Sequence, residues 1–155
     1  MLLKCLYYLG LRNAEARELL IRDIDGLRRM VKVGEGKRER QVPIPGNFGE
    51  ELLAFSQGRE GFLFEGRSRG QISDRHIRRI VKESAVKASI REAGEVHPHT
   101  LRHSYAAHLQ SSGVPLNVIQ AILGHQRKEA TAIYTRAGLE KSREWVEHAF
   151  SREKK

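Results

Sequence analysis

Apolar residues recur at helical spacing along most of the chain. The first helical face is formed by Leu2, Leu3, Cys5, Leu6 and Leu9. Gly10 follows directly, as a glycine that ends a helix often does. Asn13 is expected to cap a second helix that runs through Leu20, because its carboxamide can accept hydrogen bonds from the free amides of a first turn. Six further helices are predicted, at residues 47–56, 73–90, 100–111, 115–123, 129–136 and 139–150.

Two short strands are expected between the second and third helices, at residues 28–33 and 40–44. The intervening Gly34–Lys37 segment indicates a hairpin turn, since glycine tolerates positive φ. Pro43 and Pro45 suit a strand end or a sheet edge. The pattern therefore predicts a mainly α fold with one small antiparallel β-sheet, of the α+β class.

The length and composition exclude several classes of protein. A chain of 155 residues with 39% hydrophobic positions has enough apolar material for one domain with a real core. A single cysteine, Cys5, excludes a disulfide scaffold and a cysteine zinc site. No apolar run approaches the roughly 20 residues that span a bilayer, and the N-terminus does not resemble a signal peptide. A cytoplasmic location is therefore expected.

The chain is strongly basic. Lysine and arginine number 28 against 19 acidic residues, which gives a formal charge of +9 and a pI near 10.0. The excess is spread along the chain and is not confined to a tail. Such a charge predicts a polyanionic partner, nucleic acid ahead of anionic lipid.

Residues 97–136 contain the richest set of chemical groups. His99 and Arg102 are three positions apart at the start of a predicted helix, so their side chains point the same way. A helix N-terminus favours a phosphate, and an arginine can hold two phosphate oxygens at once. His125 follows a helix-ending glycine, and Tyr134 lies on a later helix. Each residue also has a simpler interpretation, as a loop, a solvated side chain or part of the core.

A metal site is a further interpretation of the histidines. His99 and His103 have the four-residue spacing of two ligands on one helix face. No carboxylate or thiol completes the set, so this interpretation is disfavoured.

Taken together, five segments resemble the tyrosine recombinase (phage integrase) family, in particular its Xer-type and archaeal branches. The resemblance covers nearly the whole chain. The segments are Gly10–Glu15 with the following Asp23–Asp25, Lys37–Ile44, His97–Ser104, Leu123–His125 and Ile133–Arg136.

The resemblance implies strand cleavage and rejoining of DNA through a covalent 3′-phosphotyrosine. Tyr134 would be the nucleophile, and Arg12 and Arg102 would hold the non-bridging oxygens of the scissile phosphate. His99 would assist proton transfer, and His125 would donate a hydrogen bond to the same phosphate. These groups supply the positive charge, so the resemblance implies no metal and no nucleotide cofactor.

One catalytic position departs from the family pattern. A lysine that protonates the leaving 5′ oxygen usually lies five residues before the arginine that is Arg40 here, but that position is Glu35. Lys37, in the same turn, is the nearest replacement. Lys32, on the preceding strand, is a weaker candidate, and the alternative remains that Lys37 is only a solvated turn residue.

The family also implies partners and a domain arrangement. Residues 1–150 would form the catalytic domain without the smaller N-terminal domain that precedes it in the family, and residues 151–155 would form a charged tail. The partner would be double-stranded DNA, bound by a tetramer that exchanges C-terminal helices. Residues 141–150 carry an apolar side that suits either such an exchange or docking on the chain's own core. Its residues are Trp145, Val146, Ala149 and Phe150.

Two other functions remain compatible with the same residues. A type IB topoisomerase-like enzyme would nick and religate DNA with the same groups and without a specific site. A DNA-binding module that has lost catalysis is the alternative that Glu35 and the absent domain suggest.

Overall fold

The structure, a computed structural model, describes residues 1–67, 69–124 and 136–151, without the side chains of Lys37 and Arg136. His125 and Tyr134 lie outside the described residues, as does nearly all of the predicted helix 129–136.

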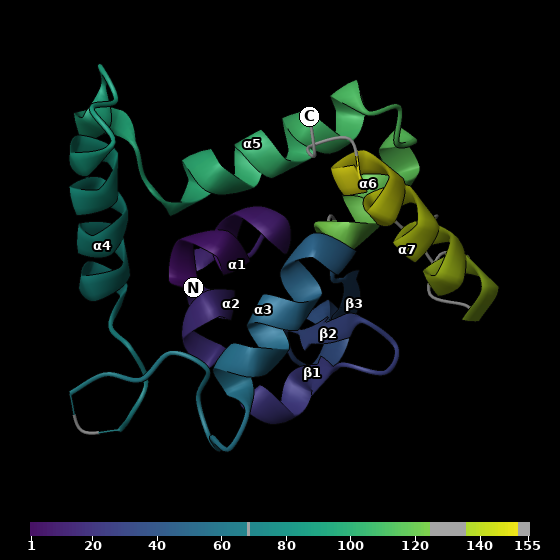
Figure 1. The fold of residues 1–155 in the computed structure, drawn as a ribbon, viewed down its shortest axis with the longest axis horizontal. Coiled ribbons are helices and arrows are strands. Elements are labelled where there is room, and N and C mark those ends of the chain that lie inside the picture. Colours follow the sequence, from purple (N-terminus) through teal and green to yellow (C-terminus); the bar gives the residue numbers. More distant parts are fainter. Residues whose placement is uncertain (68, 125–135, 152–155) are drawn as a thin grey trace.

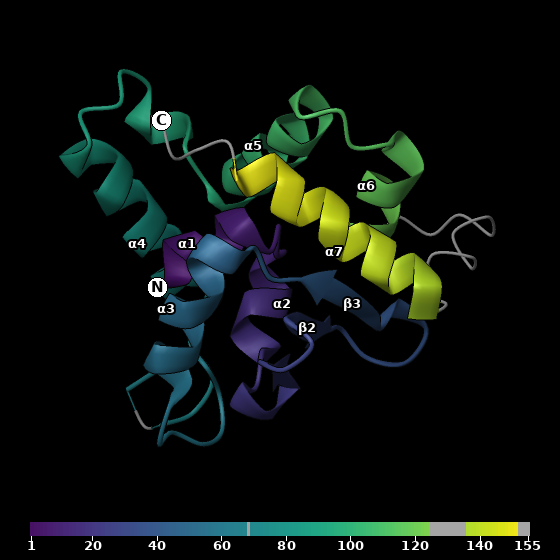
Figure 2. The same cartoon turned by 45° about the vertical axis from the view of Figure 1, so that its right-hand side comes forward.

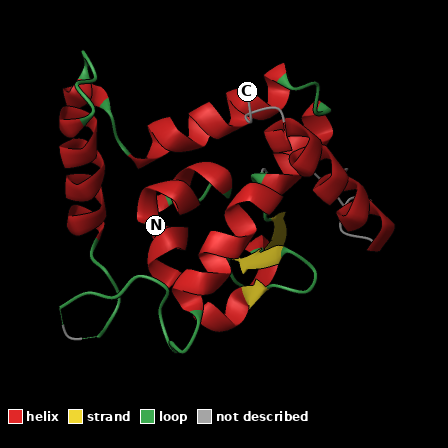
Figure 3. Ribbon diagram, in the orientation of Figure 1, coloured by secondary structure: helices red, strands yellow, loops and turns green. Residues whose placement is uncertain are grey.

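Helices make up most of the described chain (Figures 1 and 3). They are α1 (Leu2–Tyr8), α2 (Asn13–Glu18), α3 (Gly46–Ser56), α4 (Asp74–Lys87), α5 (Pro98–Ser111), α6 (Leu116–Ile122) and α7 (Arg136–Ser151), with the short 3₁₀ helices η1 (Ile21–Asp23), η2 (Gly36–Arg38) and η3 (Ala93–Glu95). In the described part of the chain, no helix is long and apolar enough to cross a membrane. The predicted mainly α fold with one small sheet is confirmed.

The sheet has three antiparallel strands in the order β1-β2-β3, namely β1 (Ile24–Asp25), β2 (Met30–Val33) and β3 (Arg40–Pro43). Val33 pairs with Arg40, so β2 and β3 form the predicted hairpin, and η2 lies in its turn. Gly34 begins this turn with φ +83°, and an added Cβ would lie 2.6 Å from the Arg38 carbonyl oxygen. The strand β1 was not predicted, because two residues show no alternation of apolar and polar positions.

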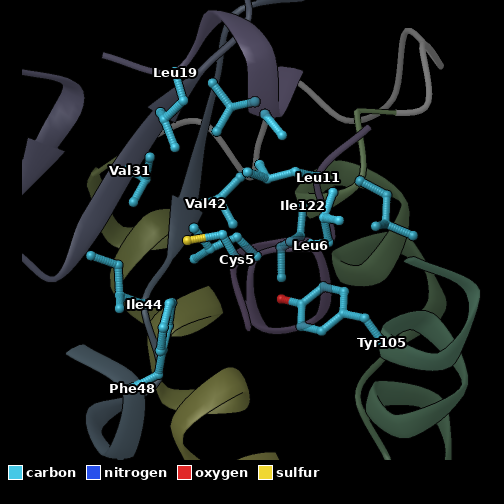
Figure 4. Packing of buried hydrophobic residues seen from close by; sticks show 14 of the residues in the cluster. Cys5, Leu6, Leu11, Leu19, Val31, Val42, Ile44, Phe48, Tyr105 and Ile122 are labelled. Atoms are coloured by element: carbon cyan, nitrogen blue, oxygen red, sulfur yellow. The ribbon is translucent and has the colours of Figure 1, made fainter. Parts of the chain in front are cut away.

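The core surrounds α1, which lies between α5 and the sheet (Figures 1 and 4). Cys5 and Leu6 are fully buried there, together with the Tyr105 ring of α5. Burial raises the pKa of the Cys5 thiol to about 12, so this thiol is uncharged and inert at neutral pH. An added Cβ on Gly10 would lie 2.5 Å from Tyr105 Cδ1, and Gly10 has φ +56°. Only glycine allows the chain to turn this close to the ring and bring Arg12 to the start of α2.

The start of α2 differs from the prediction. Asn13 was expected to cap the helix, but it is the first helical residue and Arg12 is the capping position. The Arg12 backbone N–H donates to Glu15 Oε2 at 2.7 Å, so the Glu15 carboxylate satisfies one of the free amides. The Asn13 side-chain amide instead donates to Asp74 Oδ1 and ties α2 to α4. This correction moves a functional candidate, Arg12, to the helix boundary.

The last helix, α7, packs on its own chain (Figure 2). Val146, Ala149 and Phe150 are buried in the common core. The Phe150 ring stacks on His108 of α5 with ring centroids 4.6 Å apart. Glu147 Oε2 accepts a 2.8 Å hydrogen bond from the Gly46 backbone N–H. Of the two placements left open by the sequence, the structure shows docking on the chain's own core.

Candidate active site

Arg12 lies in the turn between α1 and α2, with 38% of its side chain exposed. Its Nη1 donates to Glu15 Oε1 at 2.9 Å, while its backbone N–H donates to the other oxygen of the same carboxylate. Glu15 therefore holds both the main chain and the side chain of Arg12. Within residues 1–67, 69–124 and 136–151, Glu15 is the partner shown for this guanidinium, and the side chain is partly exposed to solvent.

Arg102 lies in the second turn of α5, and only 8% of its side chain is exposed. Its Nη1 donates to the Gly10 carbonyl oxygen and its Nη2 to the Leu123 carbonyl oxygen, each at 2.5 Å. Burial, followed by the positive charge of Arg12, lowers the pKa of Arg102 to about 10. The guanidinium stays charged at neutral pH, and its orientation is fixed by two backbone oxygens from distant segments.

Glu15 and Arg40 complete a cluster with these two arginines. Arg40 Nη1 and Nη2 donate to the two Glu15 oxygens at 2.6 and 3.0 Å. Glu15 Oε2 also lies 3.8 Å from Arg102 Nη1. Burial alone would raise the pKa of Glu15, but the hydrogen bond and charge of Arg40, with those of Arg12, outweigh it and hold the pKa at about 2. Glu15 is therefore an anion at every physiological pH.

Sequence reasoning did not identify Glu15 or Arg40 as members of the site. Two signals for them are present in the sequence. Glu15 is three residues after Arg12 on one helix, and Arg40 shares the inward side of its strand with Val42. An arginine at an inward strand position needs a buried anion, and Glu15 is that anion.

A groove of about 660 Å³ opens beside the cluster. It lies between α2, the β2–β3 turn and the end of α6, so it brings Arg12 and the hairpin to the same hollow. Its described lining residues are Arg12, Ala14, Glu15, Glu18, Gly34, Glu35, Arg38 and Gly124. Gly124 is the last described residue before His125.

His99 is the second residue of α5 and is exposed. It precedes Arg102 by one helical turn, as the sequence predicted. Partial burial, followed by the positive charges of His97 and Arg102, lowers the pKa of His99. The neutral imidazole, which can accept a proton, therefore predominates at neutral pH.

The lysine position is described in part. The backbone of Lys37 lies in η2, and Glu35 precedes it on the wall of the groove. Lys32 is on β2, and its Nζ lies 3.7 Å from Asp23 Oδ1 and 3.9 Å from Glu39 Oε2. Because two carboxylates face this ammonium group, the described contacts do not favour Lys32 as a proton donor.

A metal site finds no support in the described ranges. Within residues 1–67, 69–124 and 136–151, no three His, Cys, Asp or Glu side chains are grouped to hold an ion. Of the six predicted site residues, the structure brings Arg12 and Arg102 together and places His99 one turn away. It places the Lys37 backbone in the hairpin turn beside the groove.

Comparisons with known proteins agree with this geometry. Residues 1–141 match the model of the phage integrase family. The tyrosine recombinase XerA of Thermococcus kodakarensis is 38% identical over 152 residues, which cover 93% of this chain and 52% of that protein. The chain spans about half the length of the curated relatives it matches.

Solved structures show the same fold. The integrase from mycobacterium phage Brujita superposes with a TM-score of 0.77 and 27% identity, over 96% of this chain and 51% of that one. The XerH site-specific recombinase bound to difH substrate has a TM-score of 0.68 and 23% identity, over 91% and 43% of the two chains. With its family segments, its fold and its arginine cluster in agreement, this chain belongs to the phage integrase family.

Proposed function

We propose that this chain is the catalytic part of a site-specific DNA recombinase that cleaves and rejoins strands through a 3′-phosphotyrosine. The observation that supports this function best is the convergence of Arg12 and Arg102 on one carboxylate, beside a groove. Two guanidinium groups held this firmly suit a phosphate, whose oxygens accept paired hydrogen bonds. The family resemblance supplies Tyr134 as the nucleophile.

In the proposed step, Tyr134 Oη forms a bond to the scissile phosphorus, and the bond from phosphorus to the 5′ oxygen breaks. A phenol with a pKa of ~10 must lose its proton to react, and His99 is the base that assists. The 5′ oxygen takes a proton as it leaves, and Lys37 is the proposed donor. Religation reverses each transfer, so no oxidant, metal or nucleotide is consumed.

The arginines act where negative charge grows. Charge on the non-bridging oxygens increases as phosphorus becomes five-coordinate, so fixed guanidinium groups stabilise the transition state more than the ground state. Removal of one such preorganised donor typically costs on the order of 10²- to 10³-fold in rate. Loss of either Arg12 or Arg102 is therefore expected to slow cleavage by about that factor.

Double-stranded DNA is the proposed partner. The structural relative XerH was solved on its difH substrate. Helix α4 of this chain presents basic side chains to solvent that suit the DNA backbone, namely Arg75, Arg78, Arg79, Lys82 and Lys87. Affinity carried by such contacts falls steeply with salt. Assembly into a tetramer through exchange of the C-terminal helix belongs to the same proposal, and α7 would have to leave the position it takes here.

The experiment that tests this function traps the covalent intermediate. The chain is incubated with DNA fragments that carry a nick near the cleavage position, so that a short leaving strand diffuses away. A denaturing gel should show a protein–DNA adduct with the wild type and none with Tyr134→Phe, which keeps the ring and removes the nucleophile. A wild-type chain that binds DNA yet forms no adduct on any substrate would instead be a binding module. Relaxation of any supercoiled plasmid, without a specific site, would indicate a topoisomerase-like activity.

Lys37→Ala is expected to slow adduct formation, because the leaving 5′ oxygen then lacks its acid. A substrate with sulfur at the 5′ bridging position should restore the rate. Because a thiol has a pKa of ~8.5, the sulfur can leave as a thiolate without being protonated. Both rates are measured by quenched time courses on the two substrates. Lys32→Ala is the matched control and should respond alike to oxygen and sulfur. If sulfur fails to rescue Lys37→Ala, Lys37 is not the acid.

A further inference from the structure

Arg40 is an arginine in the candidate site that does not reach solvent. Only 1% of its side chain is exposed. Its Nη1 and Nη2 are bound to the two oxygens of Glu15, and its Nε donates to the Ile122 carbonyl oxygen at 2.6 Å. All three nitrogens of the guanidinium thus donate to acceptors of the protein itself. Arg40 is not arranged to touch DNA.

The bonds of Arg40 join three parts of the site. It extends from β3 of the hairpin, it binds Glu15 of α2, and it binds the end of α6. Arg102 holds the next carbonyl of that end, Leu123, so two buried guanidinium groups bind consecutive carbonyls. These carbonyls belong to the residues that lead into His125. Gly124, with φ +68°, passes so close that an added Cβ would lie 3.0 Å from Arg40 Cδ.

Arg40 also determines which cations the Glu15 carboxylate pairs with. The carboxylate lies within 3.0 Å of Arg40 and Arg12 nitrogens and 3.8 Å from Arg102. Arg40 binds it through two parallel bonds, the strongest geometry for such a pair. Without Arg40, the buried carboxylate of Glu15 would pair with Arg12 and Arg102 alone. It would then compete with a phosphate for the groups that must bind the phosphate.

We propose that Arg40 is a positioning residue that binds Glu15 and fixes the end of α6, and thereby keeps Arg12 and Arg102 available to the scissile phosphate. The inference rests on the proposed function. It adds a role for the hairpin that is independent of Lys37. Strand β3, which follows the turn, holds the phosphate-binding arginines in place through Arg40. Arg40 acts only through its neighbours and contacts no reacting atom.

The test compares two substrates with one variant. Arg40→Gln should form the covalent adduct about 10²-fold more slowly than wild type on an ordinary phosphodiester, as for loss of one preorganised donor. On a substrate with a methylphosphonate at the scissile position, the reacting group carries no negative charge. There the variant should react at nearly the wild-type rate. Arg12→Ala, which removes a contact to the phosphate directly, should show the same dependence on substrate charge.

The ratio of the two rates does not depend on how much of a preparation is folded, because inactive protein lowers both equally. The double variant Arg40→Gln/Glu15→Gln should recover part of the lost phosphodiester rate, since it removes the competing carboxylate. The matched control is Arg59→Gln. Arg59 also donates to two carbonyls, of Phe55 and Leu63, but lies outside the cluster.

Three outcomes would count against the inference. Equal slowing of Arg40→Gln on both substrates would reduce Arg40 to a purely structural residue. An unchanged rate on the phosphodiester would remove any role. If Arg59→Gln showed the same substrate dependence as Arg40→Gln, the effect would not belong to the cluster. A wild-type chain without adduct on either substrate would overturn the proposed function itself, and this inference with it.

Discussion

Replacing Arg102 with glutamine is expected to reduce covalent adduct formation by about 10³-fold or more, which corresponds to about 4 kcal/mol of transition-state stabilisation. The guanidinium is fixed by the carbonyl oxygens of Gly10 and Leu123, so its position costs no rearrangement during the reaction. Glutamine is shorter and uncharged. It can neither hold both carbonyls nor balance the charge on the phosphate.

Arg102→Lys separates charge from geometry. Lysine keeps the positive charge but lacks the planar fork that bridges two carbonyls and a phosphate, so its rate should stay close to that of Arg102→Gln. Single-turnover time courses at saturating protein measure the effect apart from DNA affinity. Arg143→Gln is a suitable control, since Arg143 donates to the Arg28 carbonyl from α7. A rate for Arg102→Lys within tenfold of wild type would contradict the geometric role.

Glu15→Gln is expected to destabilise the fold at neutral pH by about 3 kcal/mol, a large part of the stability of a domain of this size. The pKa of Glu15 falls from its ordinary value of 4.5 to about 2, which links its charge to folding by about 3 kcal/mol. This contribution is fully present above pH ~5 and is lost as the pH falls through 4.5 toward 2. The difference between wild type and Glu15→Gln should therefore shrink in acid.

Urea unfolding followed by circular dichroism at pH 7, 4 and 3 measures this dependence. Glu51→Gln is the matched control. Glu51 pairs with Lys4 at 2.5 Å, but both side chains are about half exposed, so its loss should cost less than about 1 kcal/mol at every pH. A Glu15→Gln effect that stays constant from pH 7 to pH 3 would show that the charge of this carboxylate does not stabilise the fold.

Periodic features of the fold were predictable from the sequence, and features set by one local contact were not. The hairpin and most helices followed from apolar spacing and glycine positions. Helix α4 was predicted to reach residue 90 but ends at Lys87, because Ser89 adopts φ +54°, outside the helical region. The apolar side of α7 was predicted, but its place on the chain's own core depended on contacts that no local pattern encodes.

The candidate site also contains residues that a local sequence pattern predicts and residues that only tertiary contacts reveal. Arg12, Arg102 and His99 could be found because they stand in recognisable segments. The pairing of Glu15 with Arg40 joins residues 25 positions apart, and Arg40 reaches Ile122 over 82 positions. The spacing of residues along the chain does not predict contacts over such separations. The local signals are the three-residue spacing of Arg12 and Glu15, and the inward position of Arg40 on β3, where a charged residue needs a partner.

The excess of positive charge in the cluster has a consequence for the domain without DNA. Arg12, Arg40 and Arg102 share one carboxylate, Glu15, and burial, followed by repulsion from Arg12, lowers the pKa of Arg102. A bound phosphate group relieves this repulsion, and a ligand that binds only the folded state raises its stability by mass action. Under the proposed function, DNA binding would therefore stabilise the folded state of this domain.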